Sequence, residues 1–227
     1  MATLLLRLAA PLQAWGVESK FETRRTLHYP TKSGVIGMIA ASLGYSRNHS
    51  LEILNGLRFG VRIDKEGELI RDYHTVRAGK PYITERYYLS DAVFLVGLEG
   101  DAELLSKIET ALKTPAYPLY LGRRSCPPTM PLVLGIKESP LFDTLNEEPW
   151  LLSDWYRQRV LYNEKTKLRI IIDDESSSAV LRDVPLSFSK KHREFSWRGV
   201  KDCGYIVSVG SEPSELKTAH DPFDELR

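Results

Sequence analysis

Four stretches of apolar residues predict the strands of a sheet within the first 140 residues of the chain. In residues 57–64, apolar side chains alternate with polar or small ones, which is typical of a strand buried on one face. Residues 3–8, 92–98 and 131–136 are continuous apolar runs, which are typical of strands inside a core. We therefore expect these four segments to form one sheet.

A helix is predicted between the first two strands. Residues 35–43 are apolar on every face of such a helix, so we expect its body to be enclosed by protein. Ser33 is the expected N-cap, and Gly44 suits the position just after the last turn. With the body buried, we expect the N-terminus to be the exposed end, where free N–H groups beside Thr31 and Lys32 suit a phosphate. An ordinary capped core helix is the equally weighted alternative.

A second, amphipathic helix and a long hairpin complete the pattern. Residues 101–113 place their leucines on one face behind the cap residue Asp101. Residues 65–90 carry β-branched and aromatic residues on both arms of a turn at 78–81, which predicts a hairpin that projects from the body.

The order strand, helix, strand, inserted hairpin, strand, helix, strand predicts an α+β fold with a ferredoxin-like domain over residues 1–138. This is the fold of RNA-recognition motifs. Their aromatic RNA-binding strand motif is missing from residues 3–8 and 92–98. Any RNA is therefore expected to be held by loops.

The signals weaken after residue 138. Residues 139–210 predict a small C-terminal β unit, with strands at 167–172, 180–186 and 205–209 and local anchors at Trp150 and Trp155. Residues 211–227 hold five acidic residues against two basic ones, and we expect a flexible tail there.

Composition excludes several classes of protein. The chain has 227 residues, 42% of them hydrophobic, which is enough for a real core. Its apolar runs are shorter than the roughly 20 residues of a membrane span, so no membrane association is expected. The first ten residues read as a strand rather than a signal peptide. Cys126 and Cys203 are too few for a disulfide framework, and a reducing cytoplasm is expected.

Charge is balanced overall but concentrated locally. The net charge is only +1. Residues 1–47 hold six basic residues against two acidic ones, and residues 187–201 hold five against one, which gives each segment a net charge of +4. Such patches are expected when a protein grips a short polyanion at a defined place.

Nucleotide and metal chemistry find little support in the motifs. The segment TKSG at 31–34 resembles the end of a P-loop but lacks the upstream glycines. The five histidines show no metal-binding spacing, so no metal and no cofactor are expected. A metal-free ribonuclease stays open as an alternative. It needs a general base, a general acid and a cation, and the side chains of His28, Tyr29, Lys32 and His74 are of the types that act in these roles. We favour hydrogen-bonding or phosphate-holding roles for these residues.

The loop GRRSCPP at 122–128 is the other dense signal. Glycine permits close approach of backbones, Arg123 and Arg124 offer forked donors, and two prolines stiffen the loop. A stiff loop that presents two arginines indicates a binding site rather than a merely solvated turn.

Four motifs together resemble the CasD family of subunits from the bacterial type I-E CRISPR surveillance complexes known as Cascade. They are LRLAAPLQAWG at 6–16, PTKSG at 30–34, RDYHT at 71–75 and YLGRRSCP at 120–127. The resemblance runs in register from residue 3 to 134 and more loosely through the C-terminal strands; segment 139–165 and the tail find no clear counterpart.

This resemblance implies a non-catalytic protein of antiviral defence that holds the 5′ handle of the CRISPR RNA and caps one end of the complex. The projecting hairpin, or thumb, is expected to reach the adjacent backbone subunit, and the large subunit to dock nearby. Carried over to this chain, the resemblance implies RNA contacts at Gln13, Trp15, Arg24, Thr31, Lys32, Ser33, His74, Arg77, Arg123 and Arg124. In subtype I-C relatives the corresponding subunit cuts precursor RNA, so a metal-independent endoribonuclease is the alternative function.

Overall fold

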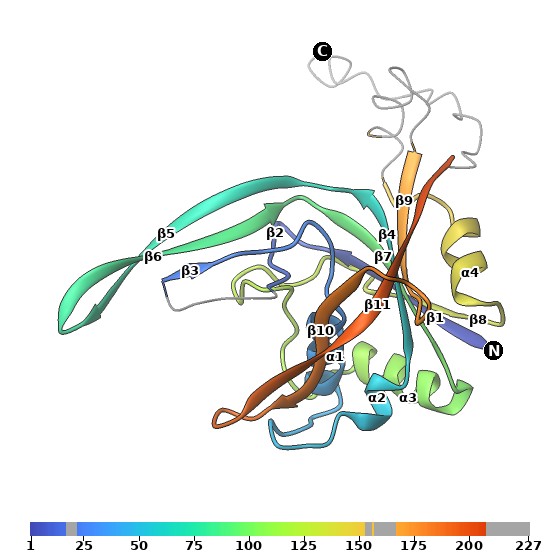
Figure 1. The fold of residues 1–227 in the computed structure, drawn as a ribbon, viewed down its shortest axis with the longest axis horizontal. Coiled ribbons are helices and arrows are strands. Elements are labelled where there is room, and N and C mark those ends of the chain that lie inside the picture. Colours follow the sequence, from blue (N-terminus) through green and yellow to red (C-terminus); the bar gives the residue numbers. More distant parts are fainter. Residues whose placement is uncertain (17–21, 153–155, 157–166, 208–227) are drawn as a thin grey trace, which may run out of the picture.

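One large antiparallel sheet organises the molecule (Figure 1). The structure is a computed structural model, and it describes residues 1–16, 22–152, 156 and 167–207. Within these residues, seven strands pair in the order β10-β11-β9-β4-β7-β1-β8, and every pairing is antiparallel. Their bounds in chain order are β1 (Ala2–Ala9), β4 (Arg58–Lys65), β7 (Val93–Gly100), β8 (Val133–Lys137), β9 (Lys167–Asp173), β10 (Val180–Phe188) and β11 (Arg193–Val207).

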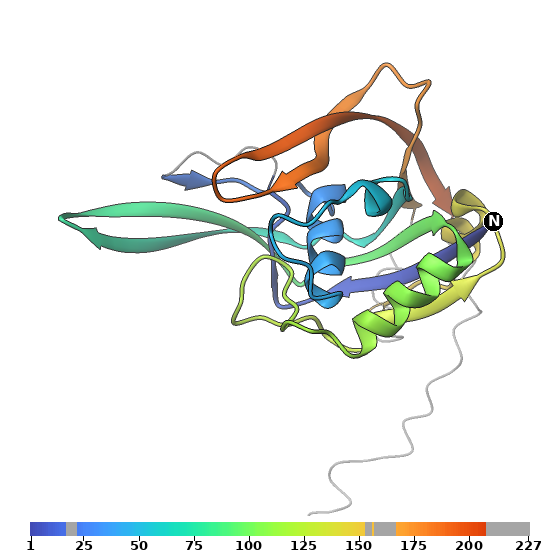
Figure 2. The same ribbon diagram turned by 90° about the horizontal axis from the view of Figure 1, so that it is seen from below.

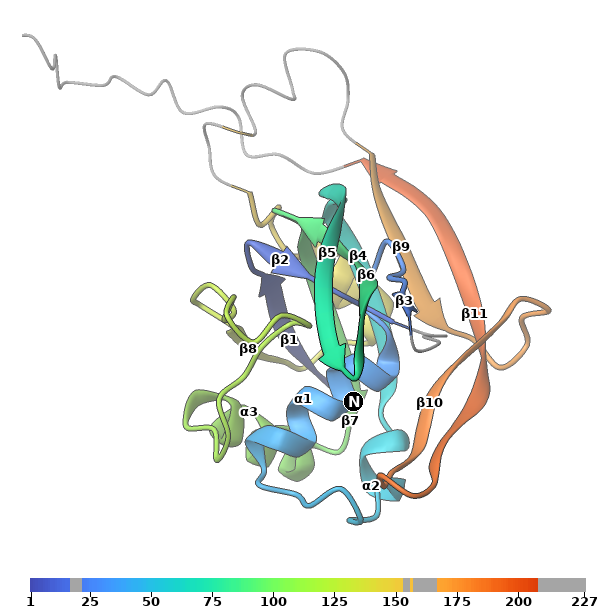
Figure 3. The same cartoon turned by 90° about the vertical axis from the view of Figure 1, so that its left-hand side faces the viewer.

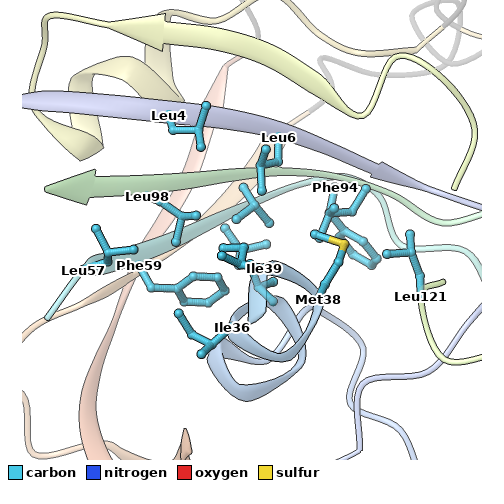
Figure 4. Close-up of a cluster of buried hydrophobic side chains, with 14 of the residues drawn as sticks. Leu4, Leu6, Ile36, Met38, Ile39, Leu57, Phe59, Phe94, Leu98 and Leu121 are labelled. Atoms are coloured by element: carbon cyan, nitrogen blue, oxygen red, sulfur yellow. The ribbon is translucent and has the colours of Figure 1, made fainter. Parts of the chain in front are cut away.

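Helices cover both faces of this sheet. On one face lie α1 (Lys32–Ser42) and α3 (Ala102–Lys113), with the short helix α2 (Glu52–Asn55) beside them (Figure 2). Figure 4 shows Leu4 and Leu6 of β1 directed toward Ile36 and Ile39 of α1. On the other face, α4 (Leu141–Glu147) packs against alternate residues of β1 and β7. Burial on both faces explains why β1 and β7 read as continuous apolar runs.

The strand β4 is buried on both faces, so the predicted half-buried pattern is wrong. Arg62 and Asp64, expected on a solvent face, are 1% and 4% exposed. Arg62 Nε lies 2.7 Å from Asp64 Oδ1, and its Nη1 donates to the carbonyl of Leu145 at 2.7 Å. Trp150 Nε1 donates to the carbonyl of Asp64 at 3.0 Å. The segment after β8 therefore covers this face and satisfies its polar groups with backbone and side-chain partners.

The helix α1 occupies the predicted place but begins differently. Its N-cap is Thr31, whose hydroxyl accepts from the Gly34 N–H at 3.2 Å, and Ser33 lies inside the first turn. The prediction of Ser33 as the N-cap is therefore wrong by two residues, although either hydroxyl suits the role. The C-terminal glycine is confirmed, since Gly44 has φ +75° and its N–H donates to the carbonyl of Ala41.

The long hairpin is confirmed. Strands β5 (Glu68–Ala78) and β6 (Lys80–Ser90) pair along their whole length around Gly79, and they project from the body as the thumb (Figure 1). Two short strands, β2 (Leu12–Gln13) and β3 (Thr23–Arg24), add to β6 at its base. The thumb is thus the extension of a second, smaller sheet.

The C-terminal strands join the main sheet. The strands predicted at 167–172 and 180–186 are confirmed as β9 and β10, whereas β11 begins at Arg193, well before the predicted start at 205. Because β9 pairs with β4, the sheet runs on across residue 138, and the division into two domains stays a prediction. Trp150 is buried; Trp155 and the expected tail lie outside the described residues. None of the helices in the described residues has the length and apolar character of a membrane span.

Candidate nucleic-acid interface

The N-terminus of α1 is buried against the C-terminal strands. Thr31, Lys32 and Ser33 are 1%, 5% and 8% exposed. The Lys32 N–H donates to Asp183 Oδ2 at 2.8 Å. Its ammonium donates to Asp173 Oδ2 at 2.9 Å and to the carbonyl of Leu57 at 2.7 Å. The expectation of an exposed, phosphate-ready helix end is therefore wrong, because a carboxylate of the protein already occupies that position.

Arg198 of β11 completes this cluster, which we call the buried ionic cluster: Lys32, Asp173, Asp183 and Arg198. Arg198 Nε donates to Asp183 Oδ1 at 2.6 Å, and Nη1 pairs with Asp173. Burial works to lower the pKa of Arg198, but the hydrogen bonds and charges of the two carboxylates outweigh it, so its pKa is raised. Burial beside this cluster also raises the pKa of Tyr29. Two cations face two carboxylates, so the cluster is already neutralised.

Gln13 and Trp15 are also buried, at 0% and 3% exposure. Gln13 Nε2 donates to the carbonyl of Ala92 at 2.7 Å. Trp15 packs so closely on α1 that a Cβ placed on Gly34 would lie 2.9 Å from its ring. Both side chains are therefore enclosed by protein, as are those of Thr31, Lys32 and Ser33, and RNA contact at these five residues stays a prediction.

The loop 120–128 pairs with the backbone of the segment that contains Gln13. The Ala14 N–H donates to the carbonyl of Leu121 at 2.8 Å, and Gln13 forms a bridge with Gly122. Gly122 has φ +112°, and a Cβ there would lie 2.6 Å from the Ala14 nitrogen. Only glycine fits, because both the backbone angle and the space exclude a side chain. The two arginines that follow are thereby fixed in position.

At the base of the thumb, Arg123 and His74 converge on Asp72. Arg123 Nη1 pairs with Asp72, and His74 Nε2 lies 2.7 Å from Asp72 Oδ2. The Arg123 guanidinium also lies 5.3 Å from the ring centre of Tyr88. The hydrogen bond from Arg123 is the main cause that holds the pKa of Asp72 below its usual value. All three polar side chains are about one-third exposed, so solvent and ligands reach them.

The strand register decides which other cations share this face. Asp72 lies opposite Arg86, and Arg86 lies opposite Arg24 of β3, so Arg24 is on the same face as Asp72 and His74. Arg77 occupies the alternate position on β5 and lies on the opposite face of the thumb. We call this face, together with the adjoining arginine loop, the hairpin-base surface; it is defined by Arg24, His74, Arg86, Arg123 and Arg124.

The remaining members of this surface differ in accessibility. Arg24 and Arg124 are exposed, and Arg124 lies 5.8 Å from the ring centre of Tyr120. Arg86 is half-buried, and its Nε atom is buried without a hydrogen-bond partner among the described residues. Asp72, Arg86 and Tyr88 were not predicted as site residues, although the two-residue spacing of Asp72 and His74 on a strand was a signal for Asp72.

Comparison with known proteins decides the family. The model for the family described as CRISPR-associated protein (Cas_Cas5) matches residues 3–201. The chain belongs to this family. It is 40% identical over 175 residues to the "CRISPR system Cascade subunit CasD" of Escherichia coli (strain K12), covering 64% of this chain and 77% of that one. The resemblance found in the sequence motifs is thereby confirmed.

Solved structures agree with this assignment to the Cas5 family. A chain of a "CRISPR RNA-guided surveillance complex" superposes with a TM-score of 0.77 at 33% identity and 91% coverage of both chains. A second structure, "Crystal structure of Cas protein", has a TM-score of 0.71 at 39% identity, covering 91% of this chain and 95% of that one.

The side chains considered for ribonuclease chemistry lie in different surroundings in this Cas5-family protein. Lys32 is paired inside the buried ionic cluster, whereas His74 lies on the thumb with Asp72. His28 is exposed before α1. Within the part of the chain that the structure describes, no group of three or more His, Cys, Asp or Glu side chains is arranged to hold a metal ion.

Proposed function

We propose that this Cas5-family protein is a non-catalytic CRISPR RNA-binding subunit of a cytoplasmic type I-E Cascade complex, and that it holds the 5′ handle of the RNA on the hairpin-base surface. The observation that carries the proposal is the excess of accessible cations on this surface, in a chain related over most of its length to CasD. One carboxylate, Asp72, contacts Arg123 and His74, while Arg24 and Arg86 lie on the same face and Arg124 is exposed on the adjoining loop. Such an excess favours a polyanion.

The chemistry of the surface suits an RNA backbone. Arg123 and Arg124 present forked donors that match phosphate oxygens, and the stiff loop limits the entropy lost when they bind. Tyr120 lies beside the Arg124 guanidinium and offers an exposed ring face, whereas Tyr88 is buried beside Arg123. Single-stranded RNA is bound by this combination of cations and aromatic rings. Arg77, on the opposite face of the thumb, is assigned to a separate phosphate or partner contact.

The thumb supports the assignment of protein partners. Large apolar side chains are exposed along it: Leu69, Ile70, Tyr73, Tyr82 and Ile83. A run of exposed apolar residues on a projecting hairpin is typical of a protein–protein contact. We assign this contact to the adjacent backbone subunit, and we expect the large subunit to dock nearby. The order β4-β7-β1-β8, with α1 and α3 on one face, supports a ferredoxin-like core for the subunit.

The non-catalytic assignment rests on the separation of the candidate groups. General acid–base catalysis needs its groups within hydrogen-bond reach of one reacting phosphate. Lys32 of α1 is already paired with Asp173. His74 lies on β5, where it contacts Asp72 of the same strand. Neither side chain is arranged with the other around a common site.

A cleavage assay tests this assignment against the endoribonuclease alternative. The purified chain is incubated with a CRISPR repeat RNA in EDTA, and we expect intact RNA with the handle region bound. Site-specific cleavage that disappears in His74→Ala or His28→Ala would show that the protein is an enzyme. Cleavage that survives alanine substitution at all four candidates, His28, Tyr29, Lys32 and His74, would indicate a contaminating nuclease.

A further inference from the structure

A second basic and aromatic surface lies on the β10–β11 hairpin, away from the hairpin-base surface. Arg193, Phe195 and Trp197 occupy alternate positions of β11, so their side chains emerge on one face of the strand. The Arg193 guanidinium lies 5.1 Å from the ring centre of Phe195. Trp197 is 60% exposed, an unusually open position for so large an apolar side chain. We call these three residues, with Lys190 and Lys191, the β11 platform.

The charge of the platform is largely uncompensated. Lys190, Lys191 and Arg193 are exposed at the turn of the hairpin, and none of them makes an ion pair with another described residue. The nearest carboxylate in sequence, Glu194, pairs with His192 at 3.0 Å and alternates to the other face of the strand. Exposed cations interleaved with ring faces are the arrangement used to track a polynucleotide backbone and stack its bases.

The hairpin is held to the body near both its open and its closed end. Arg198 and Asp183, both members of the buried ionic cluster, come from β11 and β10 respectively. Phe188 of β10 packs on α1, since a Cβ added to Gly37 would lie 3.4 Å from its ring. A rigid scaffold lowers the entropy cost of binding. The exposed Trp197 side chain contributes little to the packing of this scaffold, so its ring is available to a ligand.

Part of the hairpin-base surface lies on the same side of the thumb as the platform, whereas the loop 120–128 lies on the other side (Figure 3). The closed ends of the thumb and of the β10–β11 hairpin both point to the left in Figures 1 and 2. Strand β3, which carries Arg24 of the hairpin-base surface, lies on the same side of the thumb as this hairpin (Figure 3). Under the proposed function, the single-stranded nucleic acid near this side of the protein is the CRISPR RNA.

We propose that the β11 platform is a second binding site for single-stranded RNA. A base stacks on Trp197, and adjacent phosphates pair with Lys190, Lys191 and Arg193. This inference rests on the proposed function, because the RNA is a further segment of the strand whose handle is held at the hairpin-base surface.

Cross-linking in the assembled complex tests the platform and the proposed function separately. The complex is assembled with guide RNA containing 4-thiouridine, irradiated, and analysed by peptide mass spectrometry. We expect RNA adducts both at Trp197 and at Tyr120, which lies beneath Arg124. Adducts at Tyr120 but none at Trp197 would overturn the platform alone. Adducts at neither residue would count against the proposed function as well.

A binding measurement with the full-length chain supplies the energetic test. Trp197→Ala is expected to weaken binding of single-stranded RNA roughly 5-fold or more, and Trp197→Phe to restore most of it, because the loss of one stacked base is the cause. Tyr117→Ala, which removes another exposed ring, is the matched control and should leave affinity unchanged. Replacing Lys190 and Lys191 with alanine should reduce the slope of log affinity against log salt by about 1.4, or about 0.7 for each phosphate contact.

Other ligands give different results in these experiments. Equal losses for Trp197→Ala and Tyr117→Ala would overturn the stacking role. Cross-links from Trp197 to a thiothymidine-labelled DNA target, with none to RNA, would assign the platform to DNA and contradict the proposal.

Discussion

Two arginine–carboxylate clusters in this protein use the same chemical groups for opposite purposes. In the buried ionic cluster, Lys32 and Arg198 face Asp173 and Asp183, and the charges balance inside the protein. At the hairpin-base surface, Asp72 alone faces Arg123 and His74, with Arg24, Arg86 and Arg124 on the same surface. Charge balance and burial, not residue type, decide which cations are available to a ligand.

The difference in charge balance gives the two clusters different roles, one in the stability of the fold and one in binding. The buried cluster ties the N-terminus of α1 to strands β9, β10 and β11, so its free energy goes into holding distant parts of the chain together. The hairpin-base surface leaves positive charge uncompensated where solvent reaches it, so its free energy is realised when an anion binds. The first cluster should therefore respond to substitution in stability, and the second in binding.

The largest effect is expected from Asp183→Ala. This substitution leaves the Arg198 guanidinium and the Lys32 N–H without their carboxylate in a buried site. Breaking a buried ion pair on one side typically costs about 3–5 kcal/mol in the free energy of unfolding. Urea unfolding followed by circular dichroism measures this cost.

Asp202→Ala is the matched control for Asp183→Ala. Asp202 also pairs with an arginine, Arg169, but both side chains are more than one-third exposed. Exposed pairs contribute about 0–1 kcal/mol, so the control should unfold close to the wild-type midpoint. Similar losses for the two variants would show that burial does not distinguish the clusters.

Gly122→Ala is expected to have the next largest effect, on both stability and RNA binding. The positive φ and the 2.6 Å approach to the Ala14 nitrogen force the loop to move. A strained backbone conformation of this kind costs about 1–3 kcal/mol, and the movement displaces Arg123 and Arg124. Unfolding and RNA titration of the same sample measure the two effects.

Gly135→Ala separates backbone strain from the steric clash. Gly135 has a nearly identical φ of +116°, but a Cβ there would meet nothing within 4 Å. We expect a smaller loss of stability and unchanged RNA affinity. If Gly135→Ala weakened RNA binding as much as Gly122→Ala does, the loop geometry around Gly122 would not be responsible.

A more specific effect is expected from Arg123→Ala and Arg124→Ala. Each should weaken binding of a handle-sequence RNA and reduce the slope of log affinity against log salt by about 0.7, because one phosphate contact is lost. Fluorescence anisotropy across a salt series measures both quantities. Arg47→Ala removes another exposed arginine from the chain and is the matched control. An unchanged salt slope in both loop variants would place the RNA backbone elsewhere.

Local sequence patterns predicted helices α1 and α3, the thumb and most strands of the main sheet, because each depends on hydrophobic periodicity within about ten residues. They did not predict the fate of Lys32, since its partners Asp173 and Asp183 lie 141 and 151 residues away in the sequence. The second covered face of β4 was missed for the same reason: its cover lies more than 80 residues further along the chain.

The candidate site divides along the same line. Arg123 and Arg124 were predicted from a stiff loop, and they are accessible in the structure. The carboxylate that positions Arg123 was missed, because Asp72 lies 51 residues earlier. Gln13, Trp15, Thr31, Lys32 and Ser33 belong to recognisable motifs, yet their side chains are buried. A family motif identifies residues that matter without stating whether they act in contact or in support.

The smallest expected effect is the titration of Asp72. Arg123 lowers its pKa below the usual 3.8, so the ion pair is fully formed above that pH and is lost as pH falls through the lowered pKa. Arg123→Ala should therefore raise the pKa of Asp72, followed by carboxyl ¹³C shifts in NMR. The pKa of Asp174 is lowered mainly by a hydrogen bond from Ser176, so it should stay unchanged in this variant.

Adding RNA to the wild-type protein should also raise the pKa of Asp72, because a phosphate competes for Arg123 and repels the carboxylate. A pKa of Asp72 that does not respond to RNA would mean that Arg123 keeps its carboxylate partner, and the contrast between the two clusters would then be one of exposure alone.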